Sequence, residues 1–78
     1  MKSRANKASL TVEFDRENDG RWIAEISRLP GVLAYGKTKS EALRRVYAVA
    51  LRTLANNAEE GKSLAVISQL FTHEVVGR

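Results

Sequence analysis

Three short apolar runs open the patterned part of the chain. From residue 10 onward, Leu10, Val12 and Phe14 alternate with polar neighbours, which is the period-two pattern of a strand with one buried face. A second run follows at residues 22–26, and a shorter β-branched and aromatic run lies at residues 32–35. The pattern therefore predicts three consecutive strands.

Two glycine-containing turns separate these runs. The polar stretch after the first run ends in Asp19 and Gly20, where glycine tolerates the positive φ of a hairpin connection. Pro30 and Gly31 fit the two central positions of a type II turn, because proline fixes φ and glycine supplies the positive φ that follows. We therefore expect the three strands to form an antiparallel meander.

A change to three- and four-residue apolar spacing predicts a long helix. Thr38 and Glu41 have the spacing of a capping box, in which the threonine hydroxyl accepts from the amide of residue 41 and the glutamate reaches back to the amide of residue 38. Gly61 is the expected helix end, with Asn56 or Asn57 as earlier alternatives. The apolar face is predicted to contain Leu43, Val46, Tyr47, Ala50, Leu51 and Leu54.

The stretch after the helix is apolar but has no clean period. Its β-branched and aromatic residues favour a strand at residues 69–76, with residues 64–68 as a turn or a short connection. The predicted fold class is therefore α+β, two layers in the order β-β-β-α-β, with an antiparallel meander and one long helix packed on the sheet.

Length and charge define the domain organisation. Seventy-eight residues provide one core. Of the 13 basic residues, Lys2, Arg4 and Lys7 precede any acidic residue, which leaves ten basic against nine acidic groups in residues 8–78. We predict a basic N-terminal arm at residues 1–7 and a single, nearly neutral domain at residues 8–78.

The absence of cysteine limits the chemistry and the compartment. It excludes disulfides, thiolate nucleophiles and cysteine-ligated zinc. No signal-like apolar run begins the sequence, and no stretch approaches the roughly 20 apolar residues of a membrane span. We expect a cytoplasmic protein without a membrane partner.

A series of short motifs has a specific order. A D-G-x-W hairpin is followed by L-P-G, then by G-x-T and by E-A at the start of the helix, across about residues 10–60. This order resembles the N-terminal domain of HicB-like antitoxins. The residues of this structural motif are Gly20, Trp22, Pro30, Gly31, Gly36, Thr38, Glu41 and Ala42.

The resemblance implies a partial RNase H-like fold and a function in protein binding. HicB-like proteins neutralise a small basic mRNA-cleaving toxin, HicA, and associate with themselves. Many also carry a C-terminal DNA-binding domain, for which this sequence has no residues after Arg78. We therefore expect a HicB-like antitoxin, or a solo relative without a toxin, that does not repress its operon by that route.

Catalysis is not expected. His73 is the only histidine, and no second acid or base and no donor for a phosphate charge are indicated near it. Asp15, Glu17 and Asp19 could suggest a two-metal nuclease, but they share a hairpin loop where solvated acids are usual. We predict no catalytic residue, no metal and no cofactor.

Nucleic-acid binding is the alternative function. Trp22 and Tyr35 could stack on bases, while Arg44, Arg45 and the basic arm could contact phosphates. Trp22 shares a strand face with other apolar residues, and two adjacent helix arginines usually form a solvated face. We therefore prefer packing roles for these residues.

Self-association is the last expectation. One helix covers one face of a small sheet, which leaves the other face and at least one edge open. We predict a homodimer or a tetramer, formed through the free face or through the edge made by the C-terminal strand. The candidate interface residues are Ile23, Leu70, Phe71 and Val75.

Overall fold

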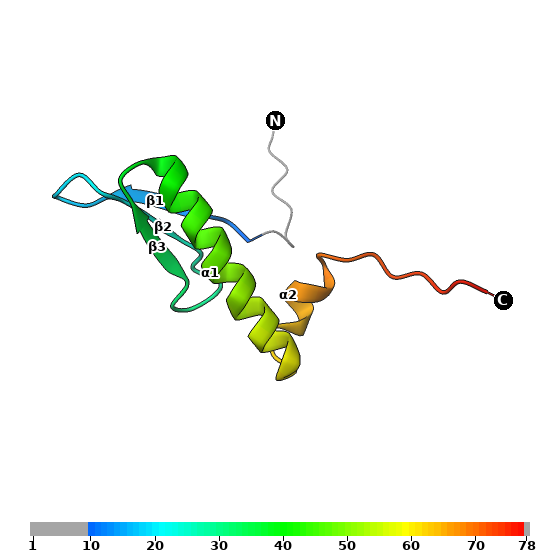
Figure 1. The fold of residues 1–78 in the computed structure, drawn as a ribbon. Coiled ribbons are helices and arrows are strands. Elements are labelled where there is room, and N and C mark those ends of the chain that lie inside the picture. Colours follow the sequence, from blue (N-terminus) through cyan, green and yellow to red (C-terminus); the bar gives the residue numbers. More distant parts are fainter. Residues whose placement is uncertain (1–9, 78) are drawn as a thin grey trace, which may run out of the picture.

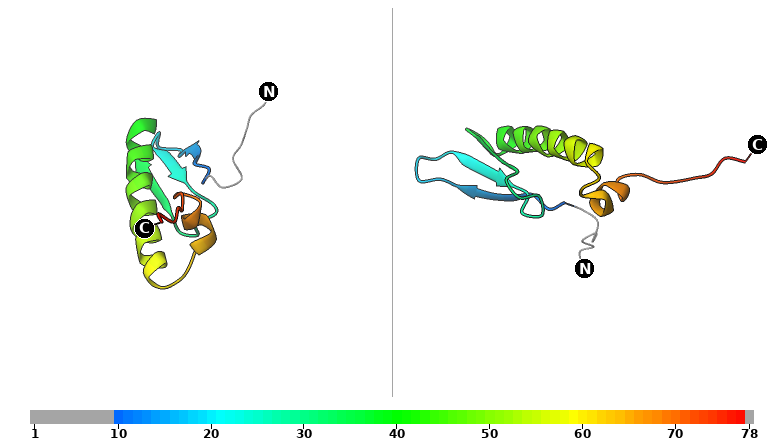
Figure 2. Two further views of the ribbon diagram at one scale, coloured as in Figure 1. Left: turned by 90° about the vertical axis from the view of Figure 1, so that its right-hand side faces the viewer. Right: turned by 90° about the horizontal axis from the view of Figure 1, so that it is seen from below.

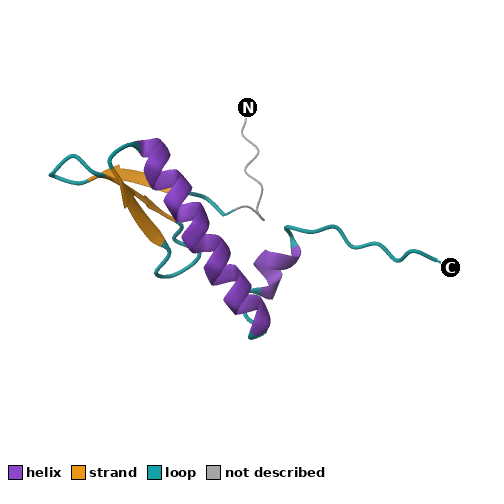
Figure 3. Ribbon diagram, in the orientation of Figure 1, coloured by secondary structure: helices purple, strands orange, loops and turns teal. Residues whose placement is uncertain are grey.

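The computed structural model describes residues 10–77, so the basic arm predicted at residues 1–7 lies outside the described part of the chain. The elements follow in the order β1 (Glu13–Arg16), β2 (Trp22–Glu25), β3 (Leu33–Gly36), α1 (Lys39–Glu59) and α2 (Leu64–Ser68). Figure 1 shows α1 lying across the sheet, and Figure 3 distinguishes the strands from the two helices. The predicted α+β class, with a long helix packed on an antiparallel sheet, is confirmed.

The sheet is a meander in the order β1-β2-β3 with both pairs antiparallel. Phe14 lies opposite Ala24, and Ala24 lies opposite Ala34. Directly opposed residues point to the same face of a sheet, so these three side chains share the face that α1 covers. The same register continues for one pair beyond the strand ends, because the amide of Ile26 donates to the carbonyl of Val32 (3.0 Å).

The two predicted glycine turns are present. Gly31 has a φ of 84°, and the amide of Val32 donates to the carbonyl of Leu29 (3.0 Å), as a type II turn centred on Pro30 and Gly31 requires. Gly20 has a φ of 91° in the hairpin between β1 and β2. Both positions therefore serve the backbone conformation.

Gly36 allows the end of β3 to approach the first turn of α1. A Cβ atom at this position would lie 2.5 Å from the amide nitrogen of Ala42 and 3.0 Å from its Cα. Ala42 is itself completely buried. The two small residues of the motif therefore let strand and helix pack backbone to backbone.

α1 begins at the predicted cap. The amide of Glu41 donates to Thr38 Oγ1 (3.0 Å), which confirms the first half of the capping box. The second half differs from the prediction, because Glu41 Oε1 accepts from the amide of Lys37 (2.7 Å) and not from that of Thr38. The glutamate thus ties the helix start to the residue that directly follows β3.

α1 ends at Glu59 with Gly61 as the predicted C′ residue, and the earlier alternatives at Asn56 and Asn57 are wrong. The amide of Gly61 donates to the carbonyl of Ala58 (3.1 Å), and the amide of Lys62 donates to that of Asn57 (2.7 Å). These two bonds form a Schellman motif.

The buried row of α1 differs in part from the predicted face. Tyr47 and Leu51 are 52% and 65% exposed. They are exposed because α1 packs on β3 and β2 and hardly contacts β1, so the side of the helix near Leu10 and Val12 stays uncovered. The buried helix residues are Ala42, Val46, Ala50 and Leu54, and they pack against Ala24, Ile26, Leu29, Val32 and Ala34.

The predicted fourth strand at residues 69–76 does not form, and the β-β-β-α-β order is corrected to β-β-β-α-α. The apolar residues of α2 form a short helix, and two more turn bonds follow it, from the amide of Leu70 to Ile67 (2.9 Å) and from that of Phe71 to Ser68 (3.3 Å). Residues 72–77 then run extended away from the sheet (Figure 2). No helix between residues 10 and 77 is long and apolar enough to cross a membrane.

Candidate functional site

The face of the sheet opposite α1 presents two cross-strand rows of side chains. In one row, Glu13 and Glu25 lie opposite each other, and Glu25 lies opposite Leu33. In the other row, Ile23 lies between Asp15 and Tyr35. α1 packs on the other side of the sheet, and Figure 2 shows no helix on this side. We call these residues the open face: Glu13, Asp15, Ile23, Glu25, Leu33 and Tyr35.

The carboxylates of the open face have no cationic partner in the part of the chain that the structure describes. Glu13, Asp15 and Glu25 are exposed, and none forms an ion pair with a residue between 10 and 77. Like charges placed directly opposite each other on neighbouring strands destabilise a sheet. The pair of glutamates therefore costs stability without a structural benefit, which is typical of residues kept for binding.

Arg21 lies at one end of the open face. Its guanidinium lies over the ring of Tyr35, 4.5 Å from the centroid, and its Nε donates to Asp19 Oδ2 (2.9 Å). A hydrogen bond from the amide of Arg21 is the main cause that lowers the pKa of Asp19, and the positive charge of Arg21 adds to it. One face of the Tyr35 ring is thus covered by a cation and is not free to stack on a base.

Basic and aromatic side chains gather on the other face, beside the start of α1. The rings of Phe14 and Trp22 meet edge to face, with centroids 6.4 Å apart. Lys39 Nζ lies 4.8 Å from the centroid of Phe14, and the guanidinium of Arg16 lies 5.0 Å from that of Trp22. The helix-side packing role predicted for Trp22 is confirmed, because Lys39 belongs to α1.

The two helix arginines considered for phosphate binding differ in their surroundings. Arg45 donates to the carbonyl of Tyr35 (3.0 Å) and to Glu41 Oε2 (3.1 Å), so its guanidinium fastens α1 to β3. The hydrogen bond from the amide of Lys37 is the main cause that lowers the pKa of Glu41, with further help from the charges of Arg45 and Arg44. Arg44 is exposed and has no ion-pair partner among the described residues.

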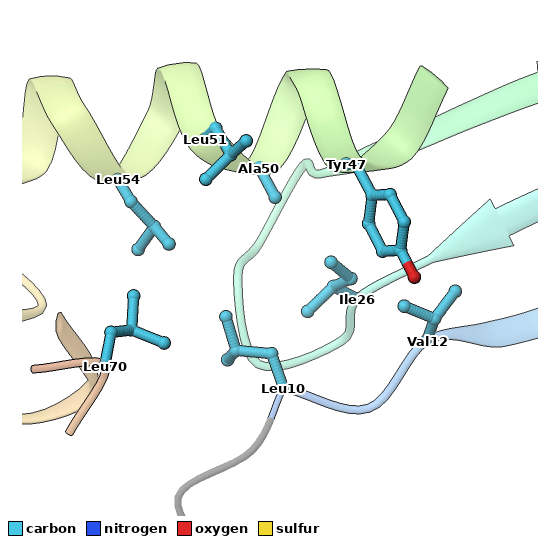
Figure 4. A pocket seen from close by; sticks show the side chains of 8 residues that line it. All are labelled: Leu10, Val12, Ile26, Tyr47, Ala50, Leu51, Leu54 and Leu70. Atoms are coloured by element: carbon cyan, nitrogen blue, oxygen red, sulfur yellow. The ribbon is translucent and has the colours of Figure 1, made fainter. Parts of the chain in front are cut away.

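An apolar groove lies between α1 and the residues that lead into β1. Figure 4 shows the side chains of Leu51 and Leu54 above it, Leu10 below it and Tyr47 at one end. Its cavity volume is about 370 Å³. We call this the apolar groove; the lining residues are Leu10, Val12, Ile26, Tyr47, Ala50, Leu51, Leu54 and Leu70.

The residues weighed for catalysis are not brought together. His73 lies exposed in the extended C-terminal segment. Asp15 accepts from the amide of Arg16 (2.8 Å), and Asp19 is held by Arg21. Within residues 10–77, no three acidic or histidine side chains are grouped so that they could hold a metal ion.

The predicted interface residues separate into two regions. Ile23 lies on the open face, whereas Leu70 lines the apolar groove on the helix side. Phe71 and Val75 are 63% and 96% exposed beyond the groove. The acidic character of the open face was missed, although the alternation that points Val12 and Phe14 toward the helix already places Glu13 and Asp15 on the other side.

Comparison with known protein families, characterised proteins and solved structures finds no match for this chain.

Proposed function

We propose that the chain is a HicB-like antitoxin or a solo relative, a non-catalytic protein-binding module that neutralises a small basic toxin of the HicA type. The observation that carries this proposal is the open face, where Glu13, Asp15 and Glu25 surround apolar side chains and have no cationic partner in residues 10–77. Exposed apolar residues among unpaired charges of one sign suit a protein partner of the opposite sign. The motif order read from the sequence supports the same family.

The distribution of charge removes an apparent conflict. A chain with a net charge of +4 is not an obvious partner for a basic protein. The open face, however, carries three carboxylates, and Arg21 at its end is paired with Asp19. Arg16 and Lys39 lie on the helix side of the sheet. The surface offered to the partner is therefore acidic although the whole chain is basic.

Coexpression with a small basic protein encoded next to this chain tests the proposal. We expect the two proteins to copurify, and we expect the chain to relieve the growth arrest that the basic protein causes alone. Glu13→Lys/Glu25→Lys should raise the Kd about 100-fold or more, because like charges across an interface cost several kcal/mol. Higher ionic strength should weaken the wild-type complex.

Glu59→Lys/Glu60→Lys is the matched control. It makes the same change of charge at the exposed C-terminal end of α1, away from the open face. We expect it to leave the Kd within about threefold of the wild-type value, since distant surface charges are largely screened. Equal losses in both double variants, or no complex with the wild-type chain, would contradict the proposal.

Nucleic-acid binding remains the alternative, and Arg44 is the described residue best placed for it. Titration with RNA and DNA at two salt concentrations distinguishes the two functions, because phosphate contacts make affinity fall steeply with salt. We assign the proposed interaction to the cytoplasm, the compartment expected from the sequence. Self-association is also part of the proposed function, and it uses a surface other than the open face.

A further inference from the structure

Among residues 10–77, no further side chain fills the apolar groove. Tyr47 and Leu51 of α1 are more than half exposed along it, and Leu10 and Val12 form its opposite wall. These two residues precede β1, whose outer edge has no neighbouring strand in the order β1-β2-β3. An apolar groove beside an unpaired strand edge is a site for an added strand, because the edge supplies backbone hydrogen bonds and the groove takes alternate side chains.

The same chain ends in a segment with the complementary properties. This segment, residues 71–76, is extended from residue 72 onward. Its apolar side chains are exposed: 63% for Phe71, 96% for Val75 and 75% for Val76. Leu70 lines the groove (Figure 4), but the chain after it runs away from the sheet (Figure 1). The sequence of this segment favours a strand, although the segment pairs with no strand of its own copy in this structure.

We propose that two copies exchange these segments, so that residues 71–76 of one copy lie along residues 10–14 of the other and place Phe71 and Val75 in its apolar groove. The exchange gives the free edge of β1 a partner and covers the apolar residues of both copies in one two-fold assembly. It also forms in trans the fourth strand that the sequence favours. This inference deepens the self-association part of the proposed function and does not involve the open face.

The length and the side-chain pattern of residues 71–76 agree with the proposed exchange. In a strand, six residues span roughly 20 Å at about 3.3 Å each, enough to lie along residues 10–14. Phe71 and Val75 fall on one side of a strand, and Thr72 and Glu74 fall on the other. His73 shares the side of Phe71, and the hydroxyl of Tyr47 at the end of the groove is available to its ring (Figure 4).

Light scattering coupled to size exclusion of the intact chain is the first test. We expect a dimer with twice the monomer mass of 8.7 kDa. Val75→Asp should raise the dimer dissociation constant about 100-fold or more, since it would bury an unpaired carboxylate. Thr72→Asp is the matched control, because it adds the same charge on the outward side of the same segment and should leave the dimer intact.

Crosslinking distinguishes exchange from folding back within one copy. The chain has no cysteine, so Leu51→Cys and Val75→Cys each introduce one thiol. We expect a short bismaleimide to join a Leu51→Cys chain to a Val75→Cys chain when the two variants are mixed. Treatment of either variant alone should give no crosslinked dimer.

The contradicting outcomes separate the two proposals. A monomeric intact chain, or a double Leu51→Cys/Val75→Cys variant that crosslinks only within one chain, would overturn the exchange. A dimer that survives Val75→Asp would overturn the exchange but keep self-association. Val75→Asp should not change binding of the basic partner, which depends on the open face.

Discussion

Gly36 is the residue on which the contact between β3 and α1 most depends. Its backbone approaches that of Ala42 so closely that an added Cβ would lie 2.5 Å from the Ala42 nitrogen. We therefore expect Gly36→Ala to lower the free energy of unfolding by about 1–3 kcal/mol, as overpacking does elsewhere. Urea denaturation measures the loss. Gly77→Ala is the control, because a Cβ there meets no atom within 4 Å; equal stability of the two variants would show that strand and helix can separate freely.

Glu41 is expected to make stability depend on pH at the acid end. The amide of Lys37 and, next, the charge of Arg45 lower the pKa of Glu41 below its ordinary value of 4.5. A lowered pKa means that the charged form stabilises the fold above pH 4.5, and that this stabilisation disappears as the pH falls through the folded-state pKa.

Glu41→Gln tests this linkage. Glutamine keeps a hydrogen-bond acceptor but lacks the charge. The variant should therefore unfold at lower urea concentration than the wild type at pH 7, and the two midpoints should converge as the pH falls through the folded-state pKa of Glu41. A difference between the two midpoints that stays constant as the pH is lowered would mean that the charge of Glu41 does not stabilise the start of α1.

At the scale of elements, α1 separates a buried row from an exposed one. Leu54 is buried in the core, whereas Leu51 is 65% exposed in the apolar groove. Leu54→Ala should cost about 2–5 kcal/mol. Leu51→Ala, which removes the same atoms, should cost less than about 1 kcal/mol when both are measured in the monomeric Val75→Asp background. Similar losses in denaturation experiments would show that the groove side of α1 is packed.

The elements that the sequence predicts correctly are those determined by neighbouring residues. The Thr38 cap and the Pro30–Gly31 turn depend on bonds across three residues, so their patterns are sufficient. A strand at residues 69–76 needs a partner strand distant in the sequence or on another chain, and propensity alone cannot provide one. The same limit explains why Tyr47 is exposed although its spacing along α1 predicts a buried residue. Its side of α1 packs against no strand.

At the scale of the whole molecule, the candidate site emerges only from the register of the sheet. Alternation along β1 places Glu13 on one face, but its unfavourable position opposite Glu25 depends on how β1 and β2 pair. The family resemblance indicates a basic partner, while the structure supplies an acidic surface that a basic protein could contact. The motif residues themselves, such as Gly36 and Thr38, serve the fold and do not form that surface.

The most direct test of the central claim is the change in backbone amide NMR shifts when the labelled chain is titrated with a small basic toxin of the proposed HicA type. We expect the largest changes at the open face, especially at Glu13, Ile23 and Glu25, and small changes along the outer side of α1 near Arg44. Changes centred on Arg44, or none at saturating partner, would contradict the assignment of the open face as the binding surface.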